Sequence, residues 1–308
     1  MDKSRRVLCE GGRQKKVIFA FIDEERGNHS VSILCKVMKV TRSGYYAWKN
    51  RTLSDHESRD TELAKLIVEI HRESRGIYGA PRIHAMLKRN SVRTSKKRVE
   101  RIMREYDICG VSKSKKRHRS TPSPERSDET LDLVKRNFFA NKPNRVWFAD
   151  ITYVKTYEGW LYLALVFDVF SRLVVGWSMG NTMEATLVDD ALEMGVTRRK
   201  PDPGLIHHSD HGSQYKSLLL GRTMRRYDIT PSMGAISSPW DNAITESLMS
   251  TIKVECVHRQ TFKTRDDARL EIFDYIETFY NKLRIHSALG NLSPIEFEAM
   301  MQERAISA

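Results

Sequence analysis

The feature that most constrains this fold is a run of three strand-like segments at residues 146–154, 160–170 and 172–179. Each is rich in Val, Leu, Ile and aromatic residues, and short turn sequences at Glu158-Gly159 and Ser171-Arg172 lie between them. Such residues favour strands, and short turn sequences between strands favour antiparallel pairing. We therefore predict a three-stranded meander.

Helical and strand patterns alternate after the meander. Helices are predicted at 182–199 with Thr182 as the N-cap, at 213–227, and after Pro239, and strands are predicted at 205–208 and 229–233. The resulting order, β-β-β-α-β-α-β-α, predicts an α/β fold with a mixed five-stranded sheet flanked by helices.

The first 110 residues show helical patterns instead. Short helices are predicted within 1–52, and Leu63, Ile67 and Ile70 begin a group of three helices within 53–110. The last of these follows Thr94 and carries its basic residues largely off its apolar stripe, as a DNA-recognition helix requires. We predict a helix-turn-helix-like basic domain at 53–110, preceded by an N-terminal helical segment at 1–52.

The charge is unevenly distributed along the chain. The 308 residues carry a net charge of +13, but residues 1–128 hold 31 Lys and Arg against 16 Asp and Glu, while residues 129–308 hold 21 against 23. A basic arm on a near-neutral body is typical of proteins that contact nucleic-acid phosphates. The alternative is a solvated basic surface that only aids solubility.

The remaining boundaries follow from composition. Residues 111–140 are rich in Lys, Arg, Ser and Pro and are predicted to be a linker to a core at 141–260. A C-terminal helical extension at 261–308 contains a capping box from Ser293 to Glu296 and one helix with a predicted apolar face, formed by Ile272, Phe273, Ile276, Phe279, Tyr280 and Leu283.

Several classes of protein are excluded by the sequence. No run of about 18 apolar residues is present, and the charged N-terminus does not resemble a secretory signal, so we expect no membrane association and a cytoplasmic location. Cys9, Cys35, Cys109 and Cys256 are widely spaced and form no C-x-x-C pair, which indicates reduced thiols.

Three carboxylates are candidates for chemistry. Asp150 interrupts an apolar strand, Asp210 ends the fourth strand, and Glu246 lies opposite the stripe formed by Ile244 and Leu248 on its helix. Each has a structural alternative: a buried Asp bonded to backbone amides, a helix cap, and a solvated charged face respectively.

The order of these residues in the fold makes them informative together. If strand 1 is central and strand 4 lies beside it, Asp150 and Asp210 become neighbours and the last helix can place Glu246 over them. Three converging carboxylates repel one another unless divalent cations compensate them, and Mg²⁺ prefers oxygen ligands. Two such ions can activate a water or hydroxyl and stabilise the leaving oxygen of a phosphodiester. His207, His208 and His211 lack further ligands at a spacing that would complete a zinc site.

Motifs along nearly the whole chain resemble one protein family. They are NRVWFADITY at 144–153, GWLYL at 159–163, DVFSR at 168–172, His-Ser-Asp at 208–210, Asp-Asn-Ala at 241–243, HSAL at 286–289, YGAPRI at 78–83 and SGYYAW at 43–48. The core resembles the DDE transposase and retroviral-integrase superfamily, with its RNase H-like fold and 35 residues between Asp210 and Glu246. The whole chain is most similar to the second-frame (OrfB) transposases of bacterial insertion sequences.

The resemblance implies roles for individual residues. Asp150, Asp210 and Glu246 would be the catalytic, metal-binding triad, holding two Mg²⁺ ions with Mn²⁺ as a substitute, and Lys253 would contact the transposon end. Further DNA contacts are predicted at basic and motif positions: Asn242, Arg82, Lys96, Lys97, Arg98, Arg101, Lys115, Lys116 and Arg117.

The predicted function is a DNA transposase catalytic subunit that cuts at transposon ends and transfers strands by 3′-hydroxyl attack. Its expected partners are double-stranded DNA, further copies of the chain on that DNA, and the upstream-frame OrfA protein or a frameshift fusion with it. The protein would associate with the nucleoid when bound to DNA. Two alternatives are a non-catalytic DNA-binding or regulatory subunit and an RNase H-fold nuclease.

Overall fold

The computed structural model describes residues 14–50, 55–112, 132–134, 140–234 and 243–307. The chain divides into two compact units, residues 1–65 and 66–308. Lys115, Lys116, Arg117 and Asn242, which are predicted to contact DNA, lie outside the described residues, as does most of the predicted linker at 111–140.

The first unit contains α2 (Gln14–Glu25), α3 (Val31–Val37), α4 (Arg42–Lys49) and the start of α5 (Asp55–Glu73). Ser30 and Thr41 cap α3 and α4 by accepting hydrogen bonds from backbone amides. Their apolar faces enclose Ile22, Cys35 and Tyr45 in a small core, so this segment has an interior of its own.

The second unit begins with three helices, as predicted: the rest of α5, then α6 (Ala80–Arg89) and α7 (Lys96–Glu105). Pro81 lies in the first turn of α6, and Ser95 caps α7. Ile67, Ile83 and Ile102 are fully buried, which leaves the basic side chains of α7 on its outer side.

The predicted sheet is confirmed. Its strands are β1 (Val146–Thr156), β2 (Gly159–Asp168), β3 (Val174–Gly180), β4 (Ile206–Ser209) and β5 (Thr230–Met233), in the order β3-β2-β1-β4-β5. β1, β2 and β3 are antiparallel neighbours, and β4 and β5 pair parallel with β1 and β4 respectively. Gly159, with φ of +116°, makes the tight β1–β2 turn. This is the mixed five-stranded sheet of an RNase H-like fold, with β1 at its centre.

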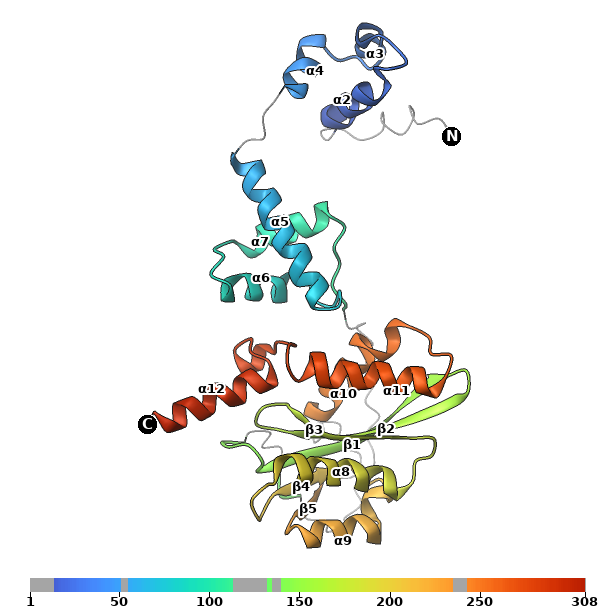
Figure 1. Cartoon of the computed structure of the whole chain (residues 1–308), viewed down its shortest axis with the longest axis vertical. Coiled ribbons are helices and arrows are strands. Elements are labelled where there is room, and N and C mark those ends of the chain that lie inside the picture. Colours follow the sequence, from blue (N-terminus) through green and yellow to red (C-terminus); the bar gives the residue numbers. More distant parts are fainter. Residues whose placement is uncertain (1–13, 51–54, 113–131, 135–139, 235–242, 308) are drawn as a thin grey trace, which may run out of the picture. The chain divides into compact units, whose positions relative to one another are not determined.

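Helices cover both faces of the sheet (Figure 1). α8 (Ala185–Arg199) and α9 (Leu218–Arg226) lie on one face, and α10 (Ala243–Glu255) and α11 (Arg265–Asp274) lie on the other. Trp147, Val166 and Leu192 belong to the main core between the sheet and α8. The prediction of one helix over 213–227 is wrong, because Ser217 ends a 3₁₀ turn (η1, Ser213–Lys216) and caps α9. Thr182 is also not an N-cap, since α8 begins at Ala185.

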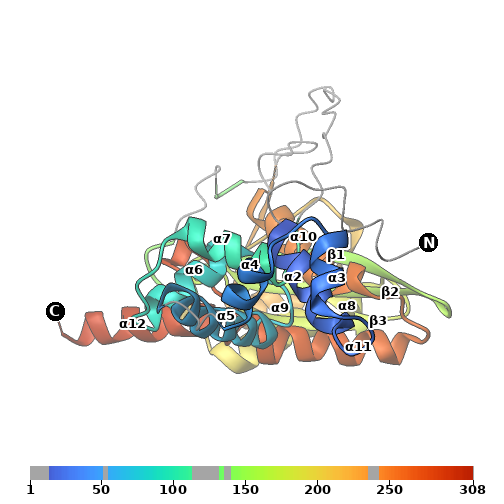
Figure 2. The ribbon, with the colours of Figure 1, turned by 90° about the horizontal axis from the view of Figure 1, so that it is seen from above.

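The C-terminal region continues from the 3₁₀ turn η3 (Val257–Arg259) through α11 to a π-helical turn, η4 (Tyr275–Tyr280). The 3₁₀ turn η5 (Ser287–Leu289) and α12 (Pro294–Ile306) follow, and α12 begins at the predicted capping box. Both views show α12 projecting outward to the C-terminus (Figure 2). The predicted apolar face is wrong at Phe273 and Leu283, which are exposed. Phe273 lies in α11 before the π turn, and Leu283 lies in a turn after it, where the predicted helix has ended. Within the described residues, no helix is long and apolar enough to cross a membrane.

Candidate active site

Asp150 lies in the middle of the central strand. Side chains alternate along β1, so Trp147 and Ala149 enter the core beside α8 while Phe148 and Asp150 belong to the opposite face. Asp150 is half-buried, and its Oδ1 accepts a hydrogen bond from the Ile151 amide at 2.8 Å. The carboxylate is therefore held by one amide in a strand that offers it little water.

The strand register brings Asp210 beside Asp150. β1 and β4 pair in parallel, with Val146 opposite Ile206 and Phe148 opposite His208. Two residues further on, Asp150 in β1 and Asp210 just after β4 occupy equivalent positions in the same sheet. This is the carboxyl end of β4, where ligand sites collect in such sheets. Asp210 Oδ1 accepts a hydrogen bond from the Gly212 amide at 2.9 Å.

Helix α10 supplies the other two predicted residues. Leu248 and Ile252 are buried, and Glu246 in the first turn is exposed, as the predicted apolar stripe requires. Helix α10 contacts β1 directly, and Lys253 Nζ lies 5.1 Å from the ring centroid of Tyr153 in that strand. This cation–π contact fixes the ammonium group over the sheet.

Electrostatic interactions connect these groups. The pKa of Asp150 is raised to about 7, first by burial and then by the charges of Asp210 and Glu246, while Lys253 and the Ile151 amide lower it. Tyr215 is buried nearby, and burial together with the charges of Asp150 and Asp210 raises its pKa well above the usual value. Asp210 and Glu246 thus each act on Asp150 through space.

The donor atoms in this region suit a hard divalent cation, because they are carboxylate oxygens. Within the described part of the chain, however, no three His, Cys, Asp or Glu side chains are close enough to hold a metal ion. The three carboxylates therefore share an electrostatic environment without forming a closed set of ligands.

His207 is buried in β4, and burial lowers its pKa to about 4. His208 is also buried, and its Nδ1 lies 3.0 Å from Ser232 Oγ.

The predicted DNA contacts on the helical domain have different environments. On α7, Lys97 is exposed and Arg98 is half-buried. Lys96 and Arg101 each pair with an acidic residue one turn further along the same helix. Arg82 of α6 pairs with Glu255 of α10 at 3.2 Å. Arg82 thus lies against α10 of the sheet domain, a contact that its place in a helix-turn-helix-like domain did not predict.

Several residues around the site were not predicted from the sequence. Tyr153 and Trp160 are 58% and 45% exposed and meet edge to face beside Lys253, a surface on which nucleic-acid bases can stack. Tyr215 was also missed; its signal was its place five residues after Asp210. The alternation of β1 could have identified Tyr153 as an outward-facing aromatic residue.

Comparisons with known proteins agree with this architecture. Residues 140–239 and 246–301 match two families described as Integrase core domain, and residues 58–116 match the HTH-like domain family. Among solved structures, the HTLV-2 integrase catalytic core domain in complex with magnesium (dimeric form) is similar with a TM-score of 0.38 and 18% identity, over 52% of this chain and 98% of that chain.

Two bacterial proteins are similar over nearly the full chain. Transposase InsF for insertion sequence IS3A of Escherichia coli (strain K12) is 36% identical over 285 residues, covering 91% of this chain and 98% of that protein. The insertion element IS600 uncharacterized 31 kDa protein of Shigella sonnei is 37% identical over 274 residues, covering 88% and 100%. The predicted resemblance is confirmed: the chain belongs to the transposase family of IS3-type insertion sequences.

Proposed function

We propose that this transposase is the catalytic subunit that cuts DNA at the ends of its insertion sequence and joins the freed 3′-hydroxyl to target DNA. The observation that carries the proposal is the parallel register of β1 and β4, which supports adjacent positions for Asp150 and Asp210. Glu246 acts electrostatically on Asp150 from α10, as the third member of a DDE triad would.

Two Mg²⁺ ions, with Mn²⁺ as a substitute, are the proposed cofactors. Asp150, Asp210 and Glu246 would hold them, because mutually repelling carboxylate oxygens match hard cations. When bound, such ions activate a water or 3′-hydroxyl and stabilise the leaving oxygen of a phosphodiester.

The chain's own residues prepare the site for this chemistry. Without a compensating cation, Asp150 retains its proton up to about pH 7, because burial and its two acidic neighbours disfavour the charged form. Lys253, held over Tyr153, supplies a positive charge close to the carboxylates and suits a phosphate of the transposon end. No covalent bond between protein and DNA is required.

The proposal includes partners. Cutting two ends and joining them to one target requires two active sites held in register, so we expect dimers or higher oligomers on double-stranded DNA. We also expect the upstream-frame OrfA protein, or a frameshift fusion with it, to supply further recognition of the ends. The exposed Lys97 and its neighbours on α7 are proposed to contact phosphates.

The direct test is a strand-transfer assay. The full chain, alone and as a fusion with its upstream frame, is incubated with Mg²⁺, a labelled duplex carrying one end of the element, and a target plasmid. We expect nicking at the 3′ end of the element and a labelled product joined to the plasmid. Nicking without joining would favour the RNase H-fold nuclease, and binding without nicking in both forms would favour the regulatory subunit.

A further inference from the structure

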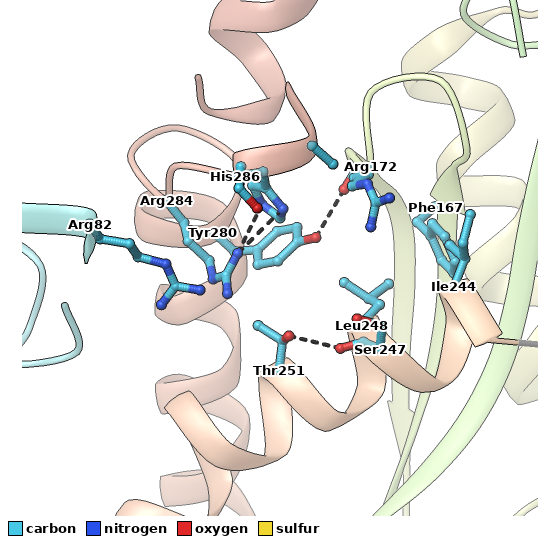
Figure 3. A pocket seen from close by; sticks show the side chains of 12 residues that line it. Arg82, Phe167, Arg172, Ile244, Ser247, Leu248, Thr251, Tyr280, Arg284 and His286 are labelled. Atoms are coloured by element: carbon cyan, nitrogen blue, oxygen red, sulfur yellow. Dashed lines mark hydrogen bonds between the residues drawn. The ribbon is translucent and has the colours of Figure 1, made fainter. Parts of the chain in front are cut away.

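A polar cavity of about 180 Å³ lies beside α10, between the turn that precedes β3 and the segment after η4 (Figure 3). Arg82 and Arg172 approach it from opposite sides, with Arg284 between them. Its volume is well above what a single water needs. The exposed residues Ser287 and Ala288 lie at its edge, so a ligand can enter from solvent.

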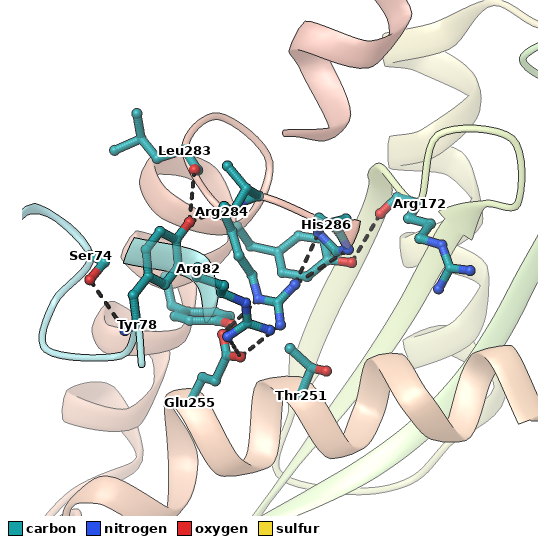
Figure 4. A network of polar contacts seen from close by, with 12 residues as sticks. Ser74, Tyr78, Arg82, Arg172, Thr251, Glu255, Leu283, Arg284 and His286 are labelled. Atoms are coloured by element: carbon teal, nitrogen blue, oxygen red, sulfur yellow. Dashed lines mark hydrogen bonds and ion pairs between the residues drawn. The ribbon is translucent and has the colours of Figure 1, made fainter. Parts of the chain in front are cut away.

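The cavity carries a net positive charge. Glu255 is buried beneath it and takes hydrogen bonds from Arg284 Nε at 2.6 Å and Arg284 Nη2 at 2.7 Å, and one from Arg82 Nη1 at 3.2 Å (Figure 4). Tyr275 donates a further bond to the same carboxylate at 2.9 Å. Three guanidinium groups, those of Arg82, Arg172 and Arg284, thus line the cavity. Glu255 pairs with two of them, and no acidic side chain among the described residues lines the cavity itself.

His286 adds no charge and removes none. It lines the cavity with both ring nitrogens within 3.3 Å of Arg284 Nη1, and burial together with the charges of Arg284, Arg172 and Arg82 lowers its pKa to about 2. The imidazole is neutral at physiological pH, so the three cations and one anion leave a net charge of +2 around the cavity.

Arg172 has donors that nothing in the described structure uses. Its backbone is fixed in the left-handed region with φ of +60°, and its carbonyl accepts a hydrogen bond from Tyr280 Oη at 3.2 Å. Its half-buried guanidinium has no hydrogen-bond or ion-pair partner among the described residues. Arg82 also uses a single donor and is 33% exposed. Planar guanidinium groups with free donors match a phosphate in geometry and charge.

The cavity lies next to the candidate active site. Ser247 and Thr251 of α10 line it, and Ser247 directly follows Glu246, so the cavity and the triad occupy neighbouring faces of one helix. A helix with its side chains is roughly 10–12 Å wide, which a DNA strand spans in about three nucleotides.

We propose that this cavity binds a backbone phosphate of the DNA substrate, a few nucleotides from the phosphodiester at the triad. The inference rests on the proposed function, since it requires that the substrate be DNA. Arg172 and Arg82 would hold the phosphate from two sides, and the Arg284–Glu255 pair would fix the floor of the cavity.

The test compares Arg172→Gln with Arg222→Gln in the full chain. Arg172→Gln removes a charge without breaking a side-chain bond, and Arg222→Gln removes the same charge from an exposed position on α9, across the sheet. Ethylation interference on a duplex carrying one end of the element, without divalent cations, identifies the phosphates each protein needs. We expect Arg172→Gln to lose one or two interference positions near the cleavage site and to lower the salt slope by about 0.9 per lost contact.

The outcomes separate this inference from the proposed function. The phosphate-binding inference is overturned if Arg172→Gln has the same interference pattern and salt slope as the wild type, or if Arg222→Gln changes them equally. This holds even if the wild type cuts and joins DNA. A different outcome is that inorganic phosphate stabilises the wild type but not Arg172→Gln against heat, with the interference pattern of the variant intact. That result would identify a small-anion site and would also overturn the inference. A wild type that gives the expected pattern but fails to cut with Mg²⁺ contradicts the proposed function alone.

Discussion

At the scale of single residues, two aspartates in the same sheet have different environments. Asp168 at the end of β2 is fully buried, and its carboxylate accepts hydrogen bonds from the amides of Asn144 and Phe170 at 2.6 and 2.9 Å. Asp150 accepts one amide bond and faces two other carboxylates. Burial raises the pKa of both carboxyls, to about 6 for Asp168 and about 7 for Asp150, but two amides hold Asp168 in the fold whereas one holds Asp150.

The contrast predicts opposite effects of the same substitution. At pH 7, Asp168→Asn should lower the free energy of unfolding by about 1–3 kcal/mol, because one amide then faces an NH₂ group. Asp150→Asn should leave that free energy unchanged or raise it, because repulsion is relieved. Denaturant unfolding of both variants checks this, and a larger loss for Asp150→Asn would show that Asp150 is structural.

His207 predicts a pH dependence of stability. Its folded pKa of about 4 is below the ordinary 6.5, so between these values the unfolded chain binds a proton that the folded chain does not. Stability from this group is complete above pH 6.5 and is lost as the pH falls towards 4, by about 2 kcal/mol at pH 5. Unfolding at pH 7 and pH 5 should show a smaller loss for His207→Phe than for wild type; equal losses would refute the assignment.

Candidate site residues could be predicted from the sequence where a charged residue departs from a local apolar pattern. Asp150 stood out because a carboxylate interrupts an apolar strand, and Glu246 because it lies opposite an apolar stripe. Arg172 gave no such signal. Arg172 becomes notable only because residues 280–288, more than a hundred positions away, meet it at the cavity, and no local period encodes that distance.

At the scale of elements, the type and order of the helices and strands could be predicted from the sequence, but some of their ends could not. All five strands and the flanking helices follow from apolar periodicity, which reports the face that an element buries. The break at Ser217 and the π turn at Tyr275–Tyr280 were not predicted, because tertiary contacts decide them. Asn281, for example, bonds the backbone of Val174 on β3 directly after the π turn.

The packing of α8 on β3 predicts a strong effect of one methyl group. A Cβ added at Gly176 would lie 2.0 Å from the Ala191 carbonyl oxygen and 2.8 Å from the Gly195 amide. Gly176→Ala should therefore lower the free energy of unfolding by about 1–3 kcal/mol or more, since α8 has to move. Gly221→Ala in α9, where nothing lies within 4 Å, should instead stabilise by about 0.5–1 kcal/mol. Similar melting temperatures for the two variants would contradict this packing.

At the scale of the second unit, α10 connects the helical domain to the integrase core domain. It carries Glu246 in its first turn and Glu255 at its last residue, where Arg82 of α6 pairs with it. Tyr78 reinforces this contact, because its hydroxyl accepts a hydrogen bond from the Ile285 amide at 2.8 Å and donates one to the Leu283 carbonyl at 3.1 Å. The helix-turn-helix-like residues are thus bound to the element that carries a candidate catalytic carboxylate.

This connection predicts that Tyr78→Phe destabilises the protein although the side chain keeps its shape. The buried Ile285 amide loses its partner, so the free energy of unfolding should fall by about 1–3 kcal/mol. Tyr106→Phe, at a side chain that is 51% exposed, is the matched control and should change little. Thermal unfolding of both variants decides the point, and equal stability would mean that the hydroxyl contributes nothing to the contact.

The proposed function places the DNA chemistry on Asp150, Asp210 and Glu246 together. Its most direct test measures nicking of a labelled duplex carrying one end of the element, with Mg²⁺, by Asp150→Asn, Asp210→Asn and Glu246→Gln. We expect each variant to lose nicking and joining while its DNA affinity and melting temperature stay at or above those of the wild type. We also expect Mg²⁺ to raise the melting temperature of the wild type more than that of any variant. Wild-type nicking by any one of the three would remove that residue from the catalytic site and contradict the claim.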